Sequence, residues 1–210
     1  LTRGYATLLY LGGLARRNLV SDMGRFYLAW RRAAGPSRFL VASRDDPAPL
    51  RDVLASAGCA NELVHRALPR ERVPGAIRAA DAGIFLYRGD LGTLGISPTK
   101  LGELLSAGRP AAGNRVGDIP HLLGNETGVI LDRLDDAALD ASAQALVALS
   151  RNPATRSACR AQAKRWFSLE TGVAAYDDLY RSLSLRPFRS RADQAWPAEL
   201  PGPSSDPATG

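Results

Sequence analysis

AGIFLYRGDLGTLGISPTKLGELLSAG, which runs from Ala82 to Gly108, is the stretch of sequence that decides the fold. Its first six residues form a short apolar run of the kind that makes a buried strand. A loop rich in glycine follows over residues 88–96. Ser97 then suits the N-cap of a helix and Pro98 its first position, because serine accepts a free N–H and proline has none to leave unpaired. The final glycine ends this helix after Ala107, so the stretch predicts a strand, a loop and a helix in succession.

The same alternation continues on both sides of this stretch. We predict earlier strands at residues 7–11, 39–42 and 62–65, and earlier helices at residues 21–34, 46–58 and 73–80. We predict later strands at residues 111–114 and 128–131 with a short helix ending near residue 123 between them, and then three helices at residues 135–150, 153–167 and 170–184. Strands that are apolar on both faces and alternate with helices indicate a parallel sheet covered by helices on both sides. The fold class is therefore α/β and Rossmann-like, with extra C-terminal helices.

The end of the chain differs in composition from the rest. Residues 185–210 are rich in Pro, Ser, Asp and Gly and poor in apolar side chains, which is typical of disorder. We therefore expect one domain over residues 1–184 and a disordered tail over residues 185–210.

Composition excludes several classes of protein. No apolar run approaches the roughly 18 to 20 residues that span a bilayer, and the first residues do not resemble a signal peptide, so we expect the cytoplasm. The two cysteines and two histidines are scattered, which argues against a metal site or a disulfide. The net charge of +6 fits an anionic ligand, an anionic membrane face or nucleic acid. Because the arginines form no stripe interleaved with aromatic residues, we do not expect a nucleic-acid partner.

Two places in the predicted sheet suit an anionic ligand, since ligands bind at the carboxyl ends of parallel strands. The first is Gly12-Gly13, directly after the first strand, where a phosphate could approach the backbone; the signal is weak, because a Gly pair after a strand is more often a plain turn. The second is the N-terminus of the helix that begins near Ser97, which contains Thr99 and Lys100. A lysine is unusual at this end of a helix, because the helix dipole disfavours a cation there unless an anion is bound.

Glu103 lies three residues after Lys100 and shares its helix face. Its carboxylate could accept hydrogen bonds from a ribose diol. The alternative is a surface ion pair between the two side chains, and spacing alone does not separate these two interpretations.

Other nucleotide-binding and hydrolytic classes lack their sequence motifs. The chain contains no Walker A motif, no G-x-G-x-x-G after its first strand and no G-x-S-x-G elbow. P-loop hydrolysis, dinucleotide chemistry and serine hydrolase chemistry are therefore not expected.

Residues 97–110, SPTKLGELLSAGRP, and residues 114–119, NRVGDI, together resemble the donor-binding signature of glycosyltransferase family 4, whose members have the GT-B fold. Residues 10–14, 73–74, 80–84 and 167–173 agree with that family in order and spacing, so the resemblance covers about residues 7–183. It implies a retaining transfer of a sugar from a nucleotide-diphosphate donor to an acceptor hydroxyl. The chain resembles only the C-terminal, donor-binding half, and we expect an N-terminal acceptor domain to be needed as well.

The resemblance also implies roles for particular residues. Glu103 matches the second Glu of the E-x7-E motif, which holds the ribose, and Lys100 neutralises the diphosphate; these are the two catalytic residues that we expect. The expected donor contacts are Gly12, Gly13, Arg44, Ser97, Pro98, Thr99, Lys100 and Glu103. Arg16 and Arg17 are further candidates for neutralising phosphate charge. Helix N-termini and basic side chains stabilise the leaving diphosphate in such enzymes, so no metal or other cofactor is expected.

Two departures from the family pattern concern the sugar end of the donor. The first Glu of E-x7-E falls on Gly95, and an Arg that is common after the first-strand glycine falls on Gly13. These departures support an alternative, a non-catalytic Rossmann-like module that binds a protein partner. For an active enzyme, the expected acceptor is a glycan or a lipid-linked glycan, with peripheral association at the inner face of the membrane.

Overall fold

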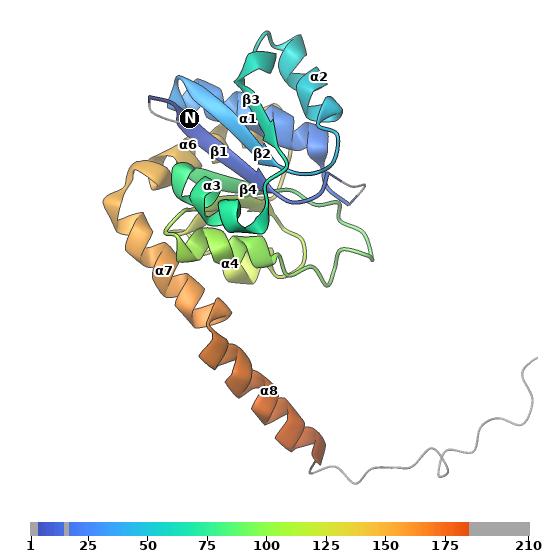
Figure 1. The fold of residues 1–210 in the computed structure, drawn as a ribbon, viewed down its shortest axis with the longest axis vertical. Coiled ribbons are helices and arrows are strands. Elements are labelled where there is room, and N and C mark those ends of the chain that lie inside the picture. The colour runs from blue at the N-terminus through green and yellow to red at the C-terminus, as the bar shows by residue number, and fades with distance from the viewer. Residues whose placement is uncertain (1–3, 15–16, 185–210) are drawn as a thin grey trace, which may run out of the picture. The chain divides into compact units, whose positions relative to one another are not determined.

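The computed structural model describes residues 4–14 and 17–184 of the 210-residue chain. Strands and helices alternate along it, as Figure 1 shows. The strands are β1 (Ala6–Leu11), β2 (Ser37–Ala42), β3 (Leu63–Arg66), β4 (Ala82–Phe85), β5 (Ala111–Asn114) and β6 (Gly128–Leu131). The helices are α1 (Val20–Ala34), α2 (Ala48–Ser56), α3 (Val73–Ala79), α4 (Thr99–Ser106), α5 (Ile119–Leu122), α6 (Asp136–Arg151), α7 (Pro153–Phe167) and α8 (Leu169–Ser184). The predicted tail at residues 185–210 and the candidate Arg16 lie outside the described residues.

The six strands form one parallel sheet in the order β3-β2-β1-β4-β5-β6. β1 is central, so that Leu9 pairs with Leu40 of β2 on one side and with Gly83 of β4 on the other. From β1 the chain adds β2 and β3 on one side and then β4, β5 and β6 on the other, so the strand order reverses between β1 and β4. Doubly wound nucleotide-binding folds have this arrangement. The predicted Rossmann-like parallel sheet is confirmed.

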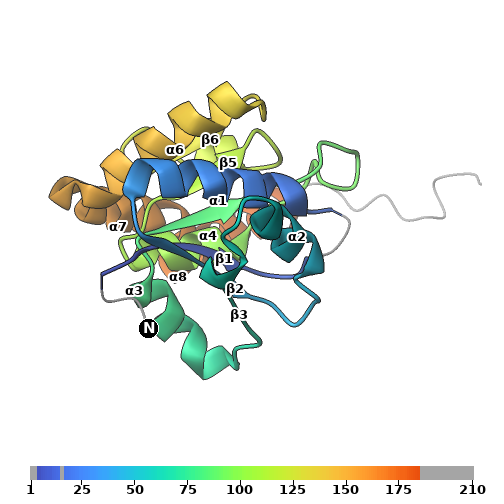
Figure 2. The same cartoon turned by 90° about the horizontal axis from the view of Figure 1, so that it is seen from above.

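Helices cover both faces of the sheet. On one face α1 packs against α2 and α6, and on the other α4 packs against α3 and α7. Figure 2 shows α1 and α6 on the opposite side of the strands from α3 and α4. A parallel sheet needs this double covering, because its strands are apolar on both faces.

The core lies between α1 and the sheet. Met23, Phe26, Tyr27 and Trp30, which repeat at helical spacing along α1, are all fully buried. The ring of Tyr27 stacks on that of Phe39 in β2, with ring centroids 5.1 Å apart. Aromatic side chains of this size supply much of the burial that stabilises a domain of this length.

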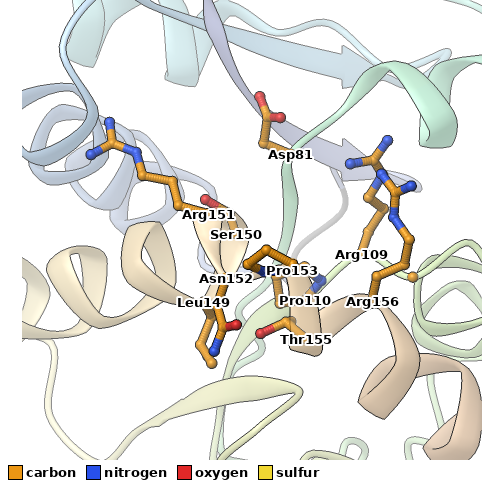
Figure 3. A pocket seen from close by; sticks show the side chains of 11 residues that line it. Asp81, Arg109, Pro110, Leu149, Ser150, Arg151, Asn152, Pro153, Thr155 and Arg156 are labelled. Atoms are coloured by element: carbon orange, nitrogen blue, oxygen red, sulfur yellow. The ribbon is translucent and has the colours of Figure 1, made fainter.

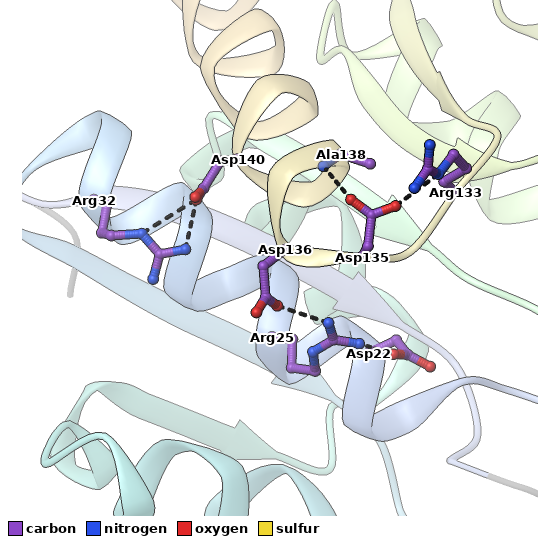
Figure 4. Close-up of polar contacts among 8 residues, drawn as sticks. All are labelled: Asp22, Arg25, Arg32, Arg133, Asp135, Asp136, Ala138 and Asp140. Atoms are coloured by element: carbon purple, nitrogen blue, oxygen red, sulfur yellow. Dashed lines mark hydrogen bonds and ion pairs between the residues drawn. The ribbon is translucent and has the colours of Figure 1, made fainter.

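Ion pairs connect α1 to α6 across the surface of the same layer (Figure 4). Arg25 contacts Asp22 on its own helix at 2.8 Å and Asp136 of α6 at 2.7 Å. Two turns further along α1, Arg32 contacts Asp140 of α6. Exposed pairs of this kind contribute at most about 1 kcal/mol each, so they orient α6 more than they stabilise it.

Helix α4 begins one residue later than the sequence predicted, at Thr99 instead of Pro98. Pro98 is the N-cap residue, with an extended backbone, and its carbonyl accepts a hydrogen bond from the N–H of Leu101 at 2.9 Å. No side chain caps this helix, so the prediction of Ser97 as N-cap and Pro98 as first helical residue is wrong. The predicted end at Gly108 is confirmed, because this glycine has a φ of 74° and its N–H bonds to the carbonyl of Leu105 at 2.8 Å.

Contacts divide the chain into two compact units, residues 1–168 and residues 169–210. The sheet with helices α1 to α7 belongs to the first unit. Helix α8 is the described part of the second, and Tyr176 and Tyr180 stack on each other along its exposed surface. The predicted domain boundary after residue 184 stays a prediction.

Candidate functional site

The carboxyl ends of β1 and β4 form one side of the sheet at the point where the strand order reverses. Open parallel sheets bind ligands at this point, because the loops that follow the two strands diverge there. A cavity of about 250 Å³ lies between these loops. It is lined by Tyr10, Leu11, Gly12, Gly13, Arg17, Asn18, Tyr87, Ile96, Ser97, Pro98, Thr99 and Lys100. The structure therefore brings the two predicted anion-binding segments together around one cavity.

Hydrogen bonds from two side chains hold the Gly12-Gly13 loop in position. The carbonyl of Gly13 accepts hydrogen bonds from the hydroxyl of Tyr10 at 2.5 Å and from Nδ2 of Asn18 at 2.8 Å. Burial, with a smaller effect of Tyr87, raises the pKa of the Tyr10 phenol above its usual range, so Tyr10 remains a neutral donor. With this carbonyl held by protein groups, the loop presents little besides backbone to the cavity.

Both glycines of this loop are closely surrounded. Gly12 has a φ of 145°, and a Cβ there would lie 3.3 Å from the hydroxyl of Tyr10. A Cβ on Gly13 would lie 3.1 Å from Oδ2 of Asp45, which accepts a hydrogen bond from the N–H of Leu14 at 2.6 Å. Asp45 therefore shapes the loop, and the sequence pattern did not reveal it because it lies in the separate loop after β2.

The other wall of the cavity is the beginning of α4. The segment before it is fixed by a hydrogen bond from the N–H of Asp118 to the carbonyl of Ile96 at 2.9 Å. Gly117 makes this approach possible, because a Cβ on Gly117 would lie only 2.1 Å from the same carbonyl oxygen. The first N–H groups of α4 carry no side-chain cap. Uncapped N–H groups and the helix dipole favour an anion at this end.

Lys100 and Glu103 form the surface ion pair that was one of the two interpretations from sequence. Nζ of Lys100 lies 2.5 Å from Oε1 of Glu103, and each side chain is 41% exposed. The two residues border different cavities: Lys100 lines the small one, and Glu103 lines a neighbouring cavity of about 700 Å³. Thr99 lines both. An exposed pair of this kind is weak, so a ligand that offers better partners to both side chains can replace it.

Arg44 is the predicted contact that the structure does not bring to either cavity. It follows β2, and its side chain is exposed. Neither the small cavity nor the cavity beside Glu103 has Arg44 in its lining. Arg17, a further basic candidate of the first loop, does line the small cavity.

Tyr10, Asn18 and Tyr87 were not predicted as site residues. The side chain of Asn114 joins the ends of β4 and β5, because its amide accepts from the N–H of Tyr87 at 2.9 Å and donates to the carbonyl of Tyr87 at 2.7 Å. Asn18 forms a bridge with Tyr87 from the other side. These contacts depend on segments far apart in the chain, so no local pattern signals them.

No protein-family model matches the sequence, and no curated protein sequence matches it. Solved structures do match its fold. Sucrose-phosphate synthase from Thermosynechococcus elongatus is 17% identical with a TM-score of 0.71, over 88% of this chain and 47% of that chain. The C-terminal domain of a glycosyl transferase group 1 family protein, LpcC, from Francisella tularensis is 11% identical with a TM-score of 0.62, over 79% of this chain and 87% of that domain. The pneumococcal O-GlcNAc transferase GtfA in complex with UDP and GlcNAc is 14% identical with a TM-score of 0.67, over 88% of this chain and 37% of that chain.

The chain therefore has the fold of the C-terminal domain of GT-B glycosyltransferases. It spans less than half the length of two of these neighbours, 47% of the sucrose-phosphate synthase chain and 37% of the GtfA chain. Within the residues that the structure describes, none of the helices combines the length and the apolar character needed to cross a bilayer.

Proposed function

We propose that this chain binds the nucleotide-diphosphate sugar of a retaining glycosyltransferase of family 4, and that an N-terminal acceptor domain completes the enzyme. The observation that carries the proposal is the single cavity at the β1–β4 reversal, where Gly12, Gly13 and the residues 97–100 meet. A GT-B fold supports it, as does a structural neighbour whose solved complex contains UDP and GlcNAc. The acceptor is a glycan or a lipid-linked glycan in this proposal.

The diphosphate occupies the small cavity. The first N–H groups of α4 and the backbone of Gly12-Gly13 face it from two sides, and Lys100 and Arg17 supply positive charge. Charge builds on the leaving diphosphate as the bond to the sugar breaks, and donors that are already in place stabilise that charge without having to reorganise. Transfer then needs neither a protein nucleophile nor a metal from this half of the enzyme.

The nucleoside lies in the neighbouring cavity. Thr99 borders both cavities, so the diphosphate and the ribose occupy continuous space along the first turn of α4. Glu103 accepts hydrogen bonds from the ribose diol. Donor binding thus separates Lys100 from Glu103, since the phosphate becomes the partner of the lysine and the ribose that of the glutamate.

The test is titration of the chain with UDP, GDP and ADP by calorimetry. One of the three should bind, and Lys100→Met and Glu103→Gln should each weaken that binding by about tenfold, which corresponds to the loss of one hydrogen bond to a charged group. Lys164→Met is the matched control, because Lys164 is an exposed lysine on α7 outside both cavities.

Two results would overturn the proposal. The first is that none of the three nucleotides binds at about 1 mM, which is the upper end of the usual range of KM values. The second is that a nucleotide binds but Lys100→Met and Glu103→Gln bind it as well as the control variant does. Unchanged nucleotide binding in these two variants, together with binding of a protein partner to the chain, would favour the non-catalytic module.

A further inference from the structure

A second polar cavity lies at the opposite end of the sheet, at the amino ends of β4 and β5. Its volume is about 350 Å³, and its walls come from the residues before these strands, the end of α6 and the beginning of α7. Figure 3 shows Arg109 and Arg156 side by side on one side of the cavity and Arg151 on the other, with Asp81 between them. No residue of the proposed donor site lines this cavity.

The charges around this cavity do not balance. Three arginines and one carboxylate, that of Asp81, line the cavity, which leaves two positive charges in excess, although Nη2 of Arg151 donates to the carbonyl of Ala34 at 3.0 Å. Oδ2 of Asp81 already accepts a hydrogen bond from the N–H of Thr7 at 2.8 Å. Among the ion pairs of the described residues, none includes Arg109, Arg151 or Arg156.

Arg109 has unused hydrogen-bonding capacity. Its Nη2 donates to the carbonyl of Arg78 at 2.6 Å, whereas its buried Nε has no hydrogen-bond partner. Burial and the nearby charge of Arg156 lower the pKa of Arg109. Holding two guanidinium groups together in this way is unfavourable unless an anion joins them.

The backbone at Gly108 allows Arg156 to lie close to Arg109. Gly108 has a φ of 74°, and a Cβ there would lie 2.4 Å from Cγ and 3.2 Å from the carbonyl oxygen of Arg156. Arg156 therefore lies directly over the glycine that ends α4, next to Arg109. Only a residue without a side chain allows this approach.

The first backbone N–H groups of α7 are not free to bind an anion in this cavity. Oδ1 of Asn152 accepts from the N–H of Ala154 at 3.0 Å, and the carbonyl of Asn152 accepts from the N–H of Thr155 at 3.2 Å. Pro153, between them, has no N–H. The contacts must come from the arginines, whose planar forks match the oxygens of a phosphate.

We propose that this cavity binds the phosphate group of a small phosphorylated polyol such as a sugar phosphate, with Arg109 and Arg156 as its principal contacts. The excess of two positive charges matches a phosphate monoester, which carries close to two negative charges at neutral pH. Ser150 and Asp81 also line the cavity; the hydroxyl of Ser150 donates to the carbonyl of Val147 at 2.8 Å, so its oxygen and the second oxygen of Asp81 remain as acceptors for the hydroxyl groups of the polyol. The volume lies at the lower end of the range for small-molecule sites, which excludes a whole nucleotide sugar.

The experiment is a calorimetric titration of the chain with inorganic phosphate, with glucose 6-phosphate and with glucose. Both phosphates should bind, glucose 6-phosphate more tightly, and glucose alone should not. Arg156→Gln should weaken binding of both at least tenfold, and so should Arg109→Lys, which keeps the charge but removes the fork. Arg51→Gln is the matched control, since Arg51 is an exposed arginine on α2.

Lys100→Met separates this site from the proposed donor site, because it should leave phosphate binding unchanged. The inference fails if neither phosphate binds at about 10 mM, or if Arg156→Gln and Arg109→Lys bind as well as Arg51→Gln. An equal loss in all three arginine variants also overturns it, since binding would then follow net charge and not this cavity. If only Lys100→Met loses phosphate binding, the phosphate occupies the small cavity at the other end of the sheet.

Discussion

Replacing Gly117 by alanine tests whether the loop before α4 holds the candidate donor site in place. An ideal Cβ at this position lies 2.1 Å from the carbonyl oxygen of Ile96, 2.9 Å from its carbonyl carbon and 3.0 Å from its nitrogen. All three are backbone atoms, so no side-chain rotation relieves the overlap. Ordinary contact begins at 3.4 Å, which means that the two segments must separate by about 1.3 Å.

The expected loss of stability has two parts. Gly117 has a φ of 55°, and alanine in this left-handed region costs about 1 kcal/mol. Forcing a methyl group into a closed contact adds roughly 1–3 kcal/mol. The total of about 3 kcal/mol predicts a melting temperature roughly 6–12 °C lower in a domain of this size. Because the hydrogen bond from Asp118 to Ile96 would be disturbed as well, we expect the affinity for the nucleotide diphosphate to fall about tenfold.

Gly95→Ala is the matched control. This glycine lies in the loop before α4, next to the Ile96 that Gly117 contacts, and a Cβ there meets nothing within 4 Å. Differential scanning calorimetry gives the melting temperature of each variant, and titration calorimetry gives its affinity. The reasoning is refuted if Gly117→Ala melts within about 2 °C of the unsubstituted chain, or if both variants lose the same amount of affinity.

Three further predictions concern the core. Leu104→Ala should lower the free energy of unfolding by about 2–5 kcal/mol in urea, whereas Leu91→Ala, at a side chain that is 89% exposed, should change it by less than about 0.5 kcal/mol. Cys59 and Cys159 should not react with a thiol reagent in the native state, because burial raises the pKa of both, that of Cys159 to about 12; rapid reaction of either before unfolding contradicts this. Burial, with a hydrogen bond to a carboxylate, raises the pKa of the Tyr27 phenol above its usual range, so the folded chain keeps a proton that the unfolded chain loses near pH 10. Stability should therefore fall by up to about 1.4 kcal/mol per pH unit above pH 10, and a Tyr27→Phe variant that falls just as steeply would contradict this origin.

Most of the fold follows from local sequence. Runs of apolar residues indicated most of the strands, because the burial of a parallel strand on both faces leaves little choice of residue. The exception is β3 at the edge of the sheet, whose residues LVHR are only partly buried or exposed. The strand predicted at residues 82–87 ends at Phe85, and the physical reason is specific. At Tyr87 the backbone bonds to the side chain of Asn114 and not to the backbone of β5, so the ladder stops although the apolar run continues.

The candidate site divides into a part that sequence could locate and a part that it could not. Topology alone places Gly12 and the start of α4 at the same edge of the sheet, since each follows a parallel strand. The supporting contacts of Asp45 and Gly117 cannot be predicted in this way, because each acts on a loop that is distant in sequence. The error at Ser97 has a local cause: Ser-Pro favours a cap followed by a helix, but the extended backbone of Pro98 delays the first turn by one residue.

The two departures from the family pattern have different physical contexts. At Gly13 a Cβ would lie 3.1 Å from Oδ2 of Asp45, whose carboxylate accepts a hydrogen bond from the N–H of Leu14, so a side chain there requires that carboxylate to shift by a few tenths of an ångström. At Gly95 the corresponding space is open, and glutamate would meet no steric obstacle. Gly95 is therefore not required by packing. Within the proposed function, the loss of the first glutamate reflects which sugar is bound or which part of the enzyme contacts it, whereas a larger residue at Gly13 requires Asp45 to adjust.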